Sequence, residues 1–274
     1  MLEPHTDGVL LSRTFFLQVS IMRAAILVAM AATSVLFGHS AMTAETNSTK
    51  VASTTPLTIY HLEGRRSERI VWFCEELGLP YKLEFKRGDL AGSMQTIREV
   101  SPLMPVAPTV RIGDQVMVES GAILQLLLAR EGKGRLQPAV DSPDFAYHLQ
   151  WMHFAEGSFA SRAIADYRVT MLQGRQQPAA GRPRLVDAEA VVKFADDFLS
   201  KHPYFGGKEF STADIMMLFP VNFAAGLNIV DMEQFPNVIA WRKKVESRPA
   251  YLRMLKVARP DGLIGSPTAL PKAK

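Results

Sequence analysis

The sequence predicts an α/β domain with a mixed sheet, followed by an all-α helical domain. Two patterns lead to this prediction. Short β-prone runs alternate with amphipathic segments between Leu57 and Arg130. After a proline-containing linker at residues 136–144, no strand-like run follows and long amphipathic segments take over. Alternating strands and helices are typical of a sheet covered by helices, whereas consecutive amphipathic segments are typical of helix-on-helix packing.

Length and composition are those of a globular protein. The 274 residues suit one large domain or two small ones, and 47% of them are hydrophobic. The net charge of +4 is modest and no dense Lys/Arg run stands out, so no nucleic-acid partner is expected. Cys74 is the single cysteine, which excludes an intrachain disulfide framework and a CxxC pair. No His/Cys cluster has the spacing of a metal site, so no metal is expected.

Residues 1–50 are predicted to be a signal-like or disordered segment outside the fold. Ala24–Phe37 is a continuous apolar run, preceded by Arg23 and followed by small residues around Ser40–Ala44. This is the layout of a secretory signal peptide, and the run is too short for a comfortable transmembrane span. We therefore expect a periplasmic or secreted protein that meets the membrane only transiently. The alternatives are an uncleaved anchor or a misassigned start, the latter giving a cytoplasmic protein.

The first predicted domain spans residues 57–131 and has the order β-α-β-α-β-β-α. Its elements up to the hairpin are expected at Leu57–His61, Ser67–Leu77, Tyr81–Phe85 and Asp89–Val100. Gly78 closes the first helix, since glycine readily adopts the left-handed conformation that ends a helix. A βαβ unit followed by an antiparallel hairpin predicts a mixed sheet with helices on its faces.

The stretch from Val106 to Ile123 carries the most information. Two short β-prone runs joined by a Gly-Asp pair predict a hairpin at Thr109–Ile112 and Gln115–Val118. Pro108 stands at the entry to the first strand, a position where a residue without an N–H is tolerated. Glu119 and Ser120 then open an apolar helix that is expected to reach Arg130. Beside the free N–H groups of a helix start, they form a polar pocket suited to the charged end of a ligand.

The second predicted domain spans residues 143–258 and is followed by a tail at 259–274. Pro143–Leu172 is interpreted as one long helix or two, and Gln173–Pro183 interrupts it. Further helices are expected at Arg184–Lys201, Ser211–Ala225 and within Phe235–Leu255. Ser211 followed three residues later by Asp214 is typical of a capping box, in which the two side chains bond the free backbone N–H groups.

These residues together resemble the glutathione S-transferase (GST) family, including its bacterial members. The order Pro108, hairpin, Glu-Ser-Gly-Ala-Ile is similar to that family's glutathione-binding segment, and LTIYHLEGRRSERIVWFCEELGLPYK is similar to its first strand, catalytic loop and first helix. The Ser211 box and the run from Phe235 are similar to its C-terminal helices. The resemblance covers about Leu57 to Ala258. It implies a thioredoxin-like N-terminal domain with a cis proline and an all-helical C-terminal domain, the GST fold.

The resemblance also implies a set of ligand-binding residues. The backbone of Ala107, before cis Pro108, is expected to pair with the cysteinyl part of glutathione, and Glu119 and Ser120 to hold its γ-glutamyl end. Arg66 is a candidate for a glutathione carboxylate. Lys86 is a candidate for the glycine carboxylate, with a solvated loop charge as the alternative. Glutathione is the expected co-substrate, with no further cofactor, and a homodimer is expected.

The thiol-activating residue stays open, because the sequence departs from the family's pattern. A cysteine thiol has a pKa of about 8.5, so its thiolate must be stabilised at neutral pH. Arg65 stands where serine-type relatives carry serine. Tyr60 ends the first strand and Ser67 begins the first helix; a packed strand residue and a helix N-cap are their alternatives. Arg65, Arg66 and backbone N–H groups are the other candidates, acting electrostatically since arginine stays protonated.

The expected reaction is attack of the glutathione thiolate on a small hydrophobic electrophile, or glutathione-dependent reduction of a peroxide or ether. Trp151, Phe154 and Phe159 lie on the helix that faces the second-substrate pocket in the family, although aromatic residues at helical spacing are also typical of a core. The alternative is a non-catalytic glutathione-binding module that serves as chaperone, scaffold or ligand carrier. A thiol-disulfide oxidoreductase is disfavoured, because Cys74 is expected to be buried and the loop has no cysteine.

Overall fold

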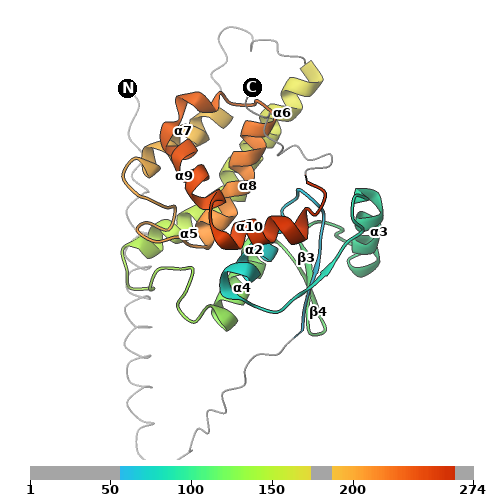
Figure 1. The fold of residues 1–274 in the computed structure, drawn as a ribbon. Helices are drawn as coiled ribbons and strands as arrows, with labels where there is room; N and C mark the ends of the chain where they lie inside the picture. The colour runs from blue at the N-terminus through green and yellow to red at the C-terminus, as the bar shows by residue number, and fades with distance from the viewer. Residues whose placement is uncertain (1–55, 174–186, 263–274) are drawn as a thin grey trace, which may run out of the picture. The chain divides into compact units, whose positions relative to one another are not determined.

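The computed structural model describes residues 56–173 and 187–262, and Figure 1 shows the arrangement of their helices and strands. The predicted signal-like segment, most of the interruption at Gln173–Pro183 and all but the first four residues of the tail lie outside these ranges. No helix among the described residues combines the length and apolarity that crossing a membrane requires.

A mixed four-stranded sheet is present, as predicted, with the order β2-β1-β3-β4. The strands are β1 (Leu57–Tyr60), β2 (Lys82–Glu84), β3 (Thr109–Ile112) and β4 (Gln115–Val118). β1 pairs parallel with β2 and antiparallel with β3, and β3 and β4 form the hairpin. The predicted hairpin bounds are confirmed, whereas β1 ends one residue early. His61 leaves the strand, although its N–H still donates to the carbonyl of Glu84 at 2.9 Å.

Three helices accompany the sheet. They are α2 (Glu68–Leu77), α3 (Leu90–Val100) and α4 (Ser120–Leu127), which continues as the π-helical turn η1 (Leu128–Gly132). Gly78 ends α2 with φ 67°, as predicted from its freedom to adopt positive φ. Apart from Glu75 and Glu76, α2 is buried, because it packs against α4, α8 and α10. Its position makes α2 the element shared by the two predicted domains.

The remaining described elements are helical, as predicted. They are α5 (Asp144–Phe154), η2 (Ala155–Ala160), α6 (Ser161–Gln173), α7 (Ala188–Leu199), α8 (Thr212–Gly226), η3 (Met232–Gln234), α9 (Pro236–Glu246) and α10 (Pro249–Ala258). The segment expected to be one helix or two is α5 and α6 joined through the π-helical η2. π-helical turns inside α-helices occur frequently at functional sites. The boundary between the two predicted domains stays a prediction.

The predicted capping box at Ser211 and Asp214 is confirmed at the start of α8. The Asp214 carboxylate is fully buried and accepts hydrogen bonds from the backbone of Ser211 and Phe205, both at 2.9 Å, and from Trp241 Nε1 at 2.8 Å. The box therefore does more than begin a helix. It joins α8 to the turn before it and to α9.

Candidate functional site

The carboxyl end of β1 and its neighbours in the sheet define the candidate site. Tyr60 lies opposite Thr109, and Thr109 lies opposite Val118, on three adjacent strands. Pro108 directly precedes β3 and Glu119 directly follows β4. Both therefore lie at the same edge of the sheet as Tyr60, where β1 ends. Residues predicted separately from the first strand and from the hairpin are therefore brought together.

The peptide bond between Ala107 and Pro108 is cis, as predicted. Pro108 is buried while Ala107 is partly exposed, and the Thr109 hydroxyl donates to the carbonyl of Val106 at 2.6 Å. Ala107 thus lies at the sheet edge, directly before the cis bond, and is partly exposed. Its pairing with glutathione stays a prediction.

Glu119 has φ 74°, a left-handed conformation that is uncommon outside glycine, and its side chain is exposed. Such backbone positions occur often at ligand-binding sites. Ser120 begins α4 and is nearly buried. Its hydroxyl oxygen accepts a hydrogen bond from Arg69 Nη1 at 3.2 Å, which leaves the hydroxyl proton available for donation.

Arg69 is a site residue whose role the sequence analysis did not recognise. It is 3% exposed and lies on α2, with Nη1 at 2.5 Å from Glu156 Oε1 and Nη2 at 2.6 Å from the carbonyl oxygen of Met216. Arg66 Nε donates to the same Glu156 oxygen at 2.8 Å. A basic residue on the apolar face of a predicted helix was the available sign. Arg69 joins α2 to Ser120, to η2 and to α8.

The charges of Arg69 and Arg66 favour the ionised form of the Glu156 carboxyl. Burial alone raises the pKa of the Glu156 carboxyl, but the charges of Arg69 and Arg66 outweigh burial and lower it. The Phe219 ring lies under both guanidinium groups, at 4.6 Å from Arg66 and 5.3 Å from Arg69. Arginine stacks on aromatic faces in this way. Arg66 uses its Nε–H for the bond to Glu156. Its predicted contact with a glutathione carboxylate would therefore be made by the other N–H groups of its guanidinium.

The three candidates for thiol activation differ in their burial and in the hydrogen bonds that they already make. Tyr60 is partly exposed, and its oxygen lies 3.5 Å from Arg111 Nε, which can only donate to it. Arg65 is partly buried, and its Nη1 donates to the carbonyl of Gly64 at 3.3 Å. Ser67 is fully buried, and its hydroxyl makes no helix-capping bond. Ser67 does stand at the N-cap position of α2, as the alternative had it, but its side chain makes no capping bond there.

Lys86 lies in the loop after β2, with an exposed side chain. Tyr60 and Glu84 are partners in the parallel pairing of β1 and β2, so Lys86 lies two residues beyond the same sheet edge. This position suits the predicted carboxylate contact, which stays a prediction. The next residue, Arg87, forms an ion pair with Asp261 instead of facing solvent alone.

Two of the three aromatic residues predicted for a second-substrate pocket lie in the core. Trp151 and Phe159 are 0% exposed, and Trp151 packs against Phe154, Phe198 and Phe205 with ring centroids 4.5–5.0 Å apart. They present no surface to a second substrate, so this prediction is wrong for them. The helical spacing of these residues reflected core packing. Phe154 is partly exposed and remains a candidate.

Cys74 is buried inside α2, as predicted, and burial raises the pKa of its thiol to about 12. Its thiol is therefore protonated and shielded at neutral pH. Within the described residues, no group of three His, Cys, Asp or Glu side chains is arranged to hold a metal ion.

Comparisons with known proteins show the family of the chain. The family model described as glutathione S-transferase, N-terminal domain, matches residues 59–135, and the model of the C-terminal domain matches residues 182–249. Together the two matches cover more than half of the chain.

Individual relatives are distant in sequence but cover most of the chain. Glutathione S-transferase 3 of Schizosaccharomyces pombe is 29% identical over 207 residues, 71% of this chain and 84% of the relative. The disulfide-bond oxidoreductase YfcG of Escherichia coli is 25% identical over 71% of this chain and 92% of its own length. A glutathione S-transferase crystal structure from Actinobacillus pleuropneumoniae has a TM-score of 0.66 at 26% identity, covering 79% of this chain and 97% of that one.

Proposed function

The chain belongs to the glutathione S-transferase family, and we propose that it binds glutathione and activates its thiol for attack on a small hydrophobic electrophile. The observation that carries this proposal is the meeting of Tyr60, the cis bond before Pro108 and the Glu119-Ser120 pair at one sheet edge. No cofactor besides the co-substrate glutathione belongs to the proposal.

In the proposed complex, each part of glutathione has its own partner. The cysteinyl backbone pairs with the backbone of Ala107, as an added strand pairs with a sheet edge. The γ-glutamyl end meets Glu119 and Ser120, where Glu119 accepts from the ammonium group and the Ser120 hydroxyl donates to the carboxylate. This assignment is supported by the bond from Arg69 to the Ser120 oxygen, because accepting that bond uses an oxygen lone pair and not the hydroxyl proton.

Tyr60 is the residue that we propose to stabilise the thiolate. Its oxygen accepts from Arg111 Nε at 3.5 Å, and this contact does not use the phenolic proton, which can therefore be donated to the sulfur. Ser67 is less suited, because its hydroxyl is buried. A hydrogen bond to the thiolate lowers the thiol pKa, and binding both reactants at one edge adds proximity. The same thiolate supports glutathione-dependent reduction of a peroxide or ether.

The test is a pH titration of the ultraviolet thiolate absorbance of glutathione bound to the purified chain. The wild-type chain should lower the thiol pKa, and Tyr60→Phe should raise it back towards that of free glutathione. Tyr81→Phe is the matched control, since the Tyr81 hydroxyl donates to Glu75 at 2.7 Å on another part of the domain. Equal pH profiles for wild type and Tyr60→Phe would remove Tyr60 from the mechanism.

A second candidate function is a glutathione-binding module without catalysis, used as chaperone, scaffold or ligand carrier. The observation that favours it is Arg65 at the position where serine-type relatives carry serine. In this case glutathione binds with an unshifted thiol pKa in the same titration. Absence of any glutathione binding would contradict both candidates and the interpretation of Glu119 and Ser120.

Two further properties are proposed on the basis of family membership and of the N-terminal sequence. A homodimer is proposed, which light scattering on the purified chain tests directly. Export with removal of the signal-like segment is proposed from the apolar run Ala24–Phe37, with a cytoplasmic protein as the alternative. Mass spectrometry of the protein from its source cell decides between them, because an exported chain loses the residues before about Ala41.

A further inference from the structure

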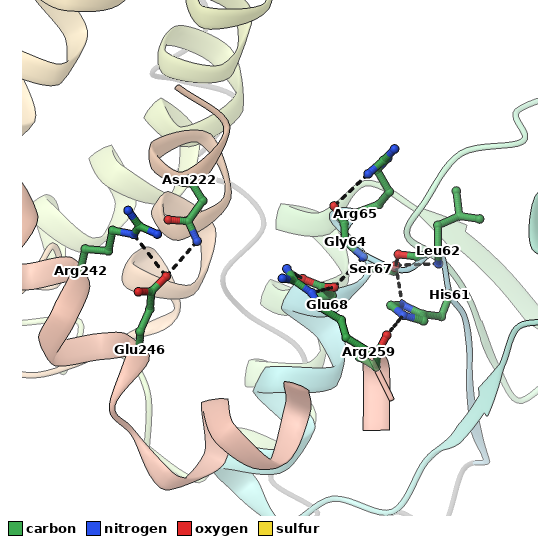
Figure 2. A network of polar contacts seen from close by, with 11 residues as sticks. His61, Leu62, Gly64, Arg65, Ser67, Glu68, Asn222, Arg242, Glu246 and Arg259 are labelled. Carbon is green, nitrogen blue, oxygen red and sulfur yellow. Dashed lines mark hydrogen bonds and ion pairs between the residues drawn. The ribbon is translucent and has the colours of Figure 1, made fainter. Parts of the chain in front are cut away.

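His61 is buried at the start of the loop that leads from β1 to α2, and both of its ring nitrogens have partners (Figure 2). Nδ1 lies 2.8 Å from the Ser67 hydroxyl, and Nε2 lies 2.8 Å from the carbonyl oxygen of Ala258, 197 residues further along the chain. A carbonyl oxygen only accepts, so the bond to Ala258 requires the proton on Nε2. When the ring is neutral, Nδ1 is then the acceptor, and the Ser67 hydroxyl donates to it.

The groups around His61 favour the neutral form of its ring, which is the form in which Nδ1 accepts from Ser67. Burial lowers the pKa of His61, and the charge of Arg259 lowers it further, against the opposing effects of the Ala258 carbonyl and of Glu68 and Glu63. The Ser67 proton is therefore committed within the loop, to His61 Nδ1 at 2.8 Å with the carbonyl oxygen of Leu62 at 3.2 Å as its other acceptor. This commitment explains why a hydroxyl at the start of α2 neither caps the helix nor remains free for a bound thiol.

The rest of the loop, residues 61–67, is held by a second set of bonds. The Ser67 oxygen accepts from the N–H of Leu62 at 3.1 Å, and Glu68 Oε1 accepts from the N–H of Gly64 at 2.7 Å. The same Glu68 carboxylate forms a bidentate ion pair with Arg259, and both side chains are 10% exposed (Figure 2). Paired hydrogen bonds of this kind fix orientation as well as distance.

A third contact joins the segment after α10 to the loop that follows β2. Arg87, in the loop after β2, forms an ion pair with Asp261, and the neighbouring N–H of Gly88 donates to Glu63 Oε2 at 2.8 Å. Residues 258–261, which end α10 and follow it, thus contact the loop through a carbonyl, through Glu68, and through the loop that borders it. The loop has turn bonds of its own, such as the bond from the N–H of Arg65 to the carbonyl of Leu62 at 3.1 Å, and the contacts from residues 258–261 fix how these turns sit against the rest of the domain.

We propose that the 258–261 segment holds the 61–67 loop in the conformation that glutathione activation requires, with His61 and Arg259 as positioning residues. This inference rests on the proposed function, because it assigns the loop to the thiol site. Ser67 then belongs to the support of the loop and not to the groups that touch the thiol. The chemistry at one end of the α/β domain depends on contacts made by the last described helix.

The first test compares two arginines that link the region of α10 to α2. Arg259→Met removes the guanidinium group that pairs with Glu68, and Arg248→Met removes the one that pairs with Glu76 at 2.6 and 2.8 Å. Glu76 bonds no loop amide, so Arg248→Met is the matched control. Hydrogen exchange of the loop amides, measured on the full chain without glutathione, should accelerate about tenfold in Arg259→Met and remain unchanged in Arg248→Met.

The second test separates the two bonds of His61. In His61→Gln the side-chain amide reaches the position of Nε2 and keeps the bond to Ala258, whereas in His61→Asn it reaches only the position of Nδ1 and keeps the bond to Ser67. The apparent KM for glutathione should rise about tenfold in His61→Asn and in Arg259→Met, and much less in His61→Gln and in Arg248→Met. Rescue by glutamine is a result that a general loss of stability does not produce.

The results that would contradict the positioning role differ from the result that would contradict the proposed function. Equal loop exchange in Arg259→Met and Arg248→Met, or equal KM values for His61→Asn and His61→Gln, would overturn it. Faster exchange with unchanged glutathione KM and thiol pKa would also overturn it, since the segment then holds the loop without serving the site. If the wild-type chain binds no glutathione, the proposed function fails and the positioning role falls with it, whereas the exchange data still report whether the segment holds the loop.

Discussion

Arg69 on α2 and Glu156 on the π-helical η2 lie 2.5 Å apart, and this ion pair joins the sheet-bearing part of the chain to the helical part. The two residues are 87 positions apart in the sequence. Arg69 also donates to Ser120 and to the Met216 carbonyl, so one buried guanidinium group connects the proposed glutathione site to two helices.

Replacing Arg69 with alanine should destabilise the protein by about 3 kcal/mol, because the buried Met216 carbonyl and part of the Glu156 charge lose their partner. Arg69→Lys should recover only part of this loss, since one ammonium group does not reproduce the fork of a guanidinium. Denaturant unfolding measures both. Arg66→Ala is the control: Arg66 is 28% exposed and should cost within about 1 kcal/mol. Equal losses for the two alanine variants would contradict the central role of Arg69.

Replacing Ser120 with alanine should weaken glutathione binding about tenfold, because the proposed donor to the γ-glutamyl carboxylate is lost. Calorimetric titration with glutathione measures the change. Ser200→Ala is the control, since the exposed Ser200 hydroxyl donates only to the carbonyl of Asp197. An affinity of Ser120→Ala equal to that of wild type shows that the γ-glutamyl end binds elsewhere.

The Cys74 thiol should resist alkylation in the folded protein. Its pKa is raised to about 12 by burial, so its thiolate fraction at pH 8 is far below that of a free cysteine, and the side chain is fully buried. Labelling with iodoacetamide, followed by mass spectrometry, should be at least about a hundredfold slower in native buffer than in denaturant. Comparable rates in both conditions would show that Cys74 is exposed, and would reopen a role for its own sulfur chemistry.

Acid should destabilise the protein through His148. Burial lowers its pKa from 6.5 to about 4, with a further lowering from His153. Between these two pH values the unfolded chain binds the proton and the folded chain does not, so stability falls as the pH drops from 6.5 towards 4. A shift of this size corresponds to at most about 3 kcal/mol.

The measurement is the free energy of unfolding of wild type and His148→Gln at several pH values. The variant should lose part of the acid dependence, while His61, whose pKa burial also lowers, and Asp214, whose pKa burial raises to about 6 and which acts in the opposite direction, contribute equally to both proteins. The comparison at pH 7, where both histidines are neutral in the fold, isolates the packing cost of the substitution. Parallel curves for the two proteins over the acid range would contradict the assignment to His148.

Local patterns were enough for most of the secondary structure. The hairpin from Thr109 to Val118, the end of α2 at Gly78 and the capping box at Ser211 were predicted correctly, because each depends on residues only a few positions apart. Turn chemistry, capping and alternation act over such short distances. The resemblance of the hairpin region to a known family added the cis bond before Pro108, which the structure confirms.

The tertiary structure alone decided what the helices face and which side chains meet. Periodicity predicts an apolar face but not its partner, so the burial of Trp151 and Phe159 in the core was not distinguished from a substrate pocket. His61 meets Ala258, and Arg69 meets Glu156, across separations of 197 and 87 residues. Contacts over such distances depend on how whole elements pack, which no local pattern of residues contains. The sequence by itself therefore determined the elements and the residues of the proposed glutathione-binding segment, and packing determined how that segment and its loop are held.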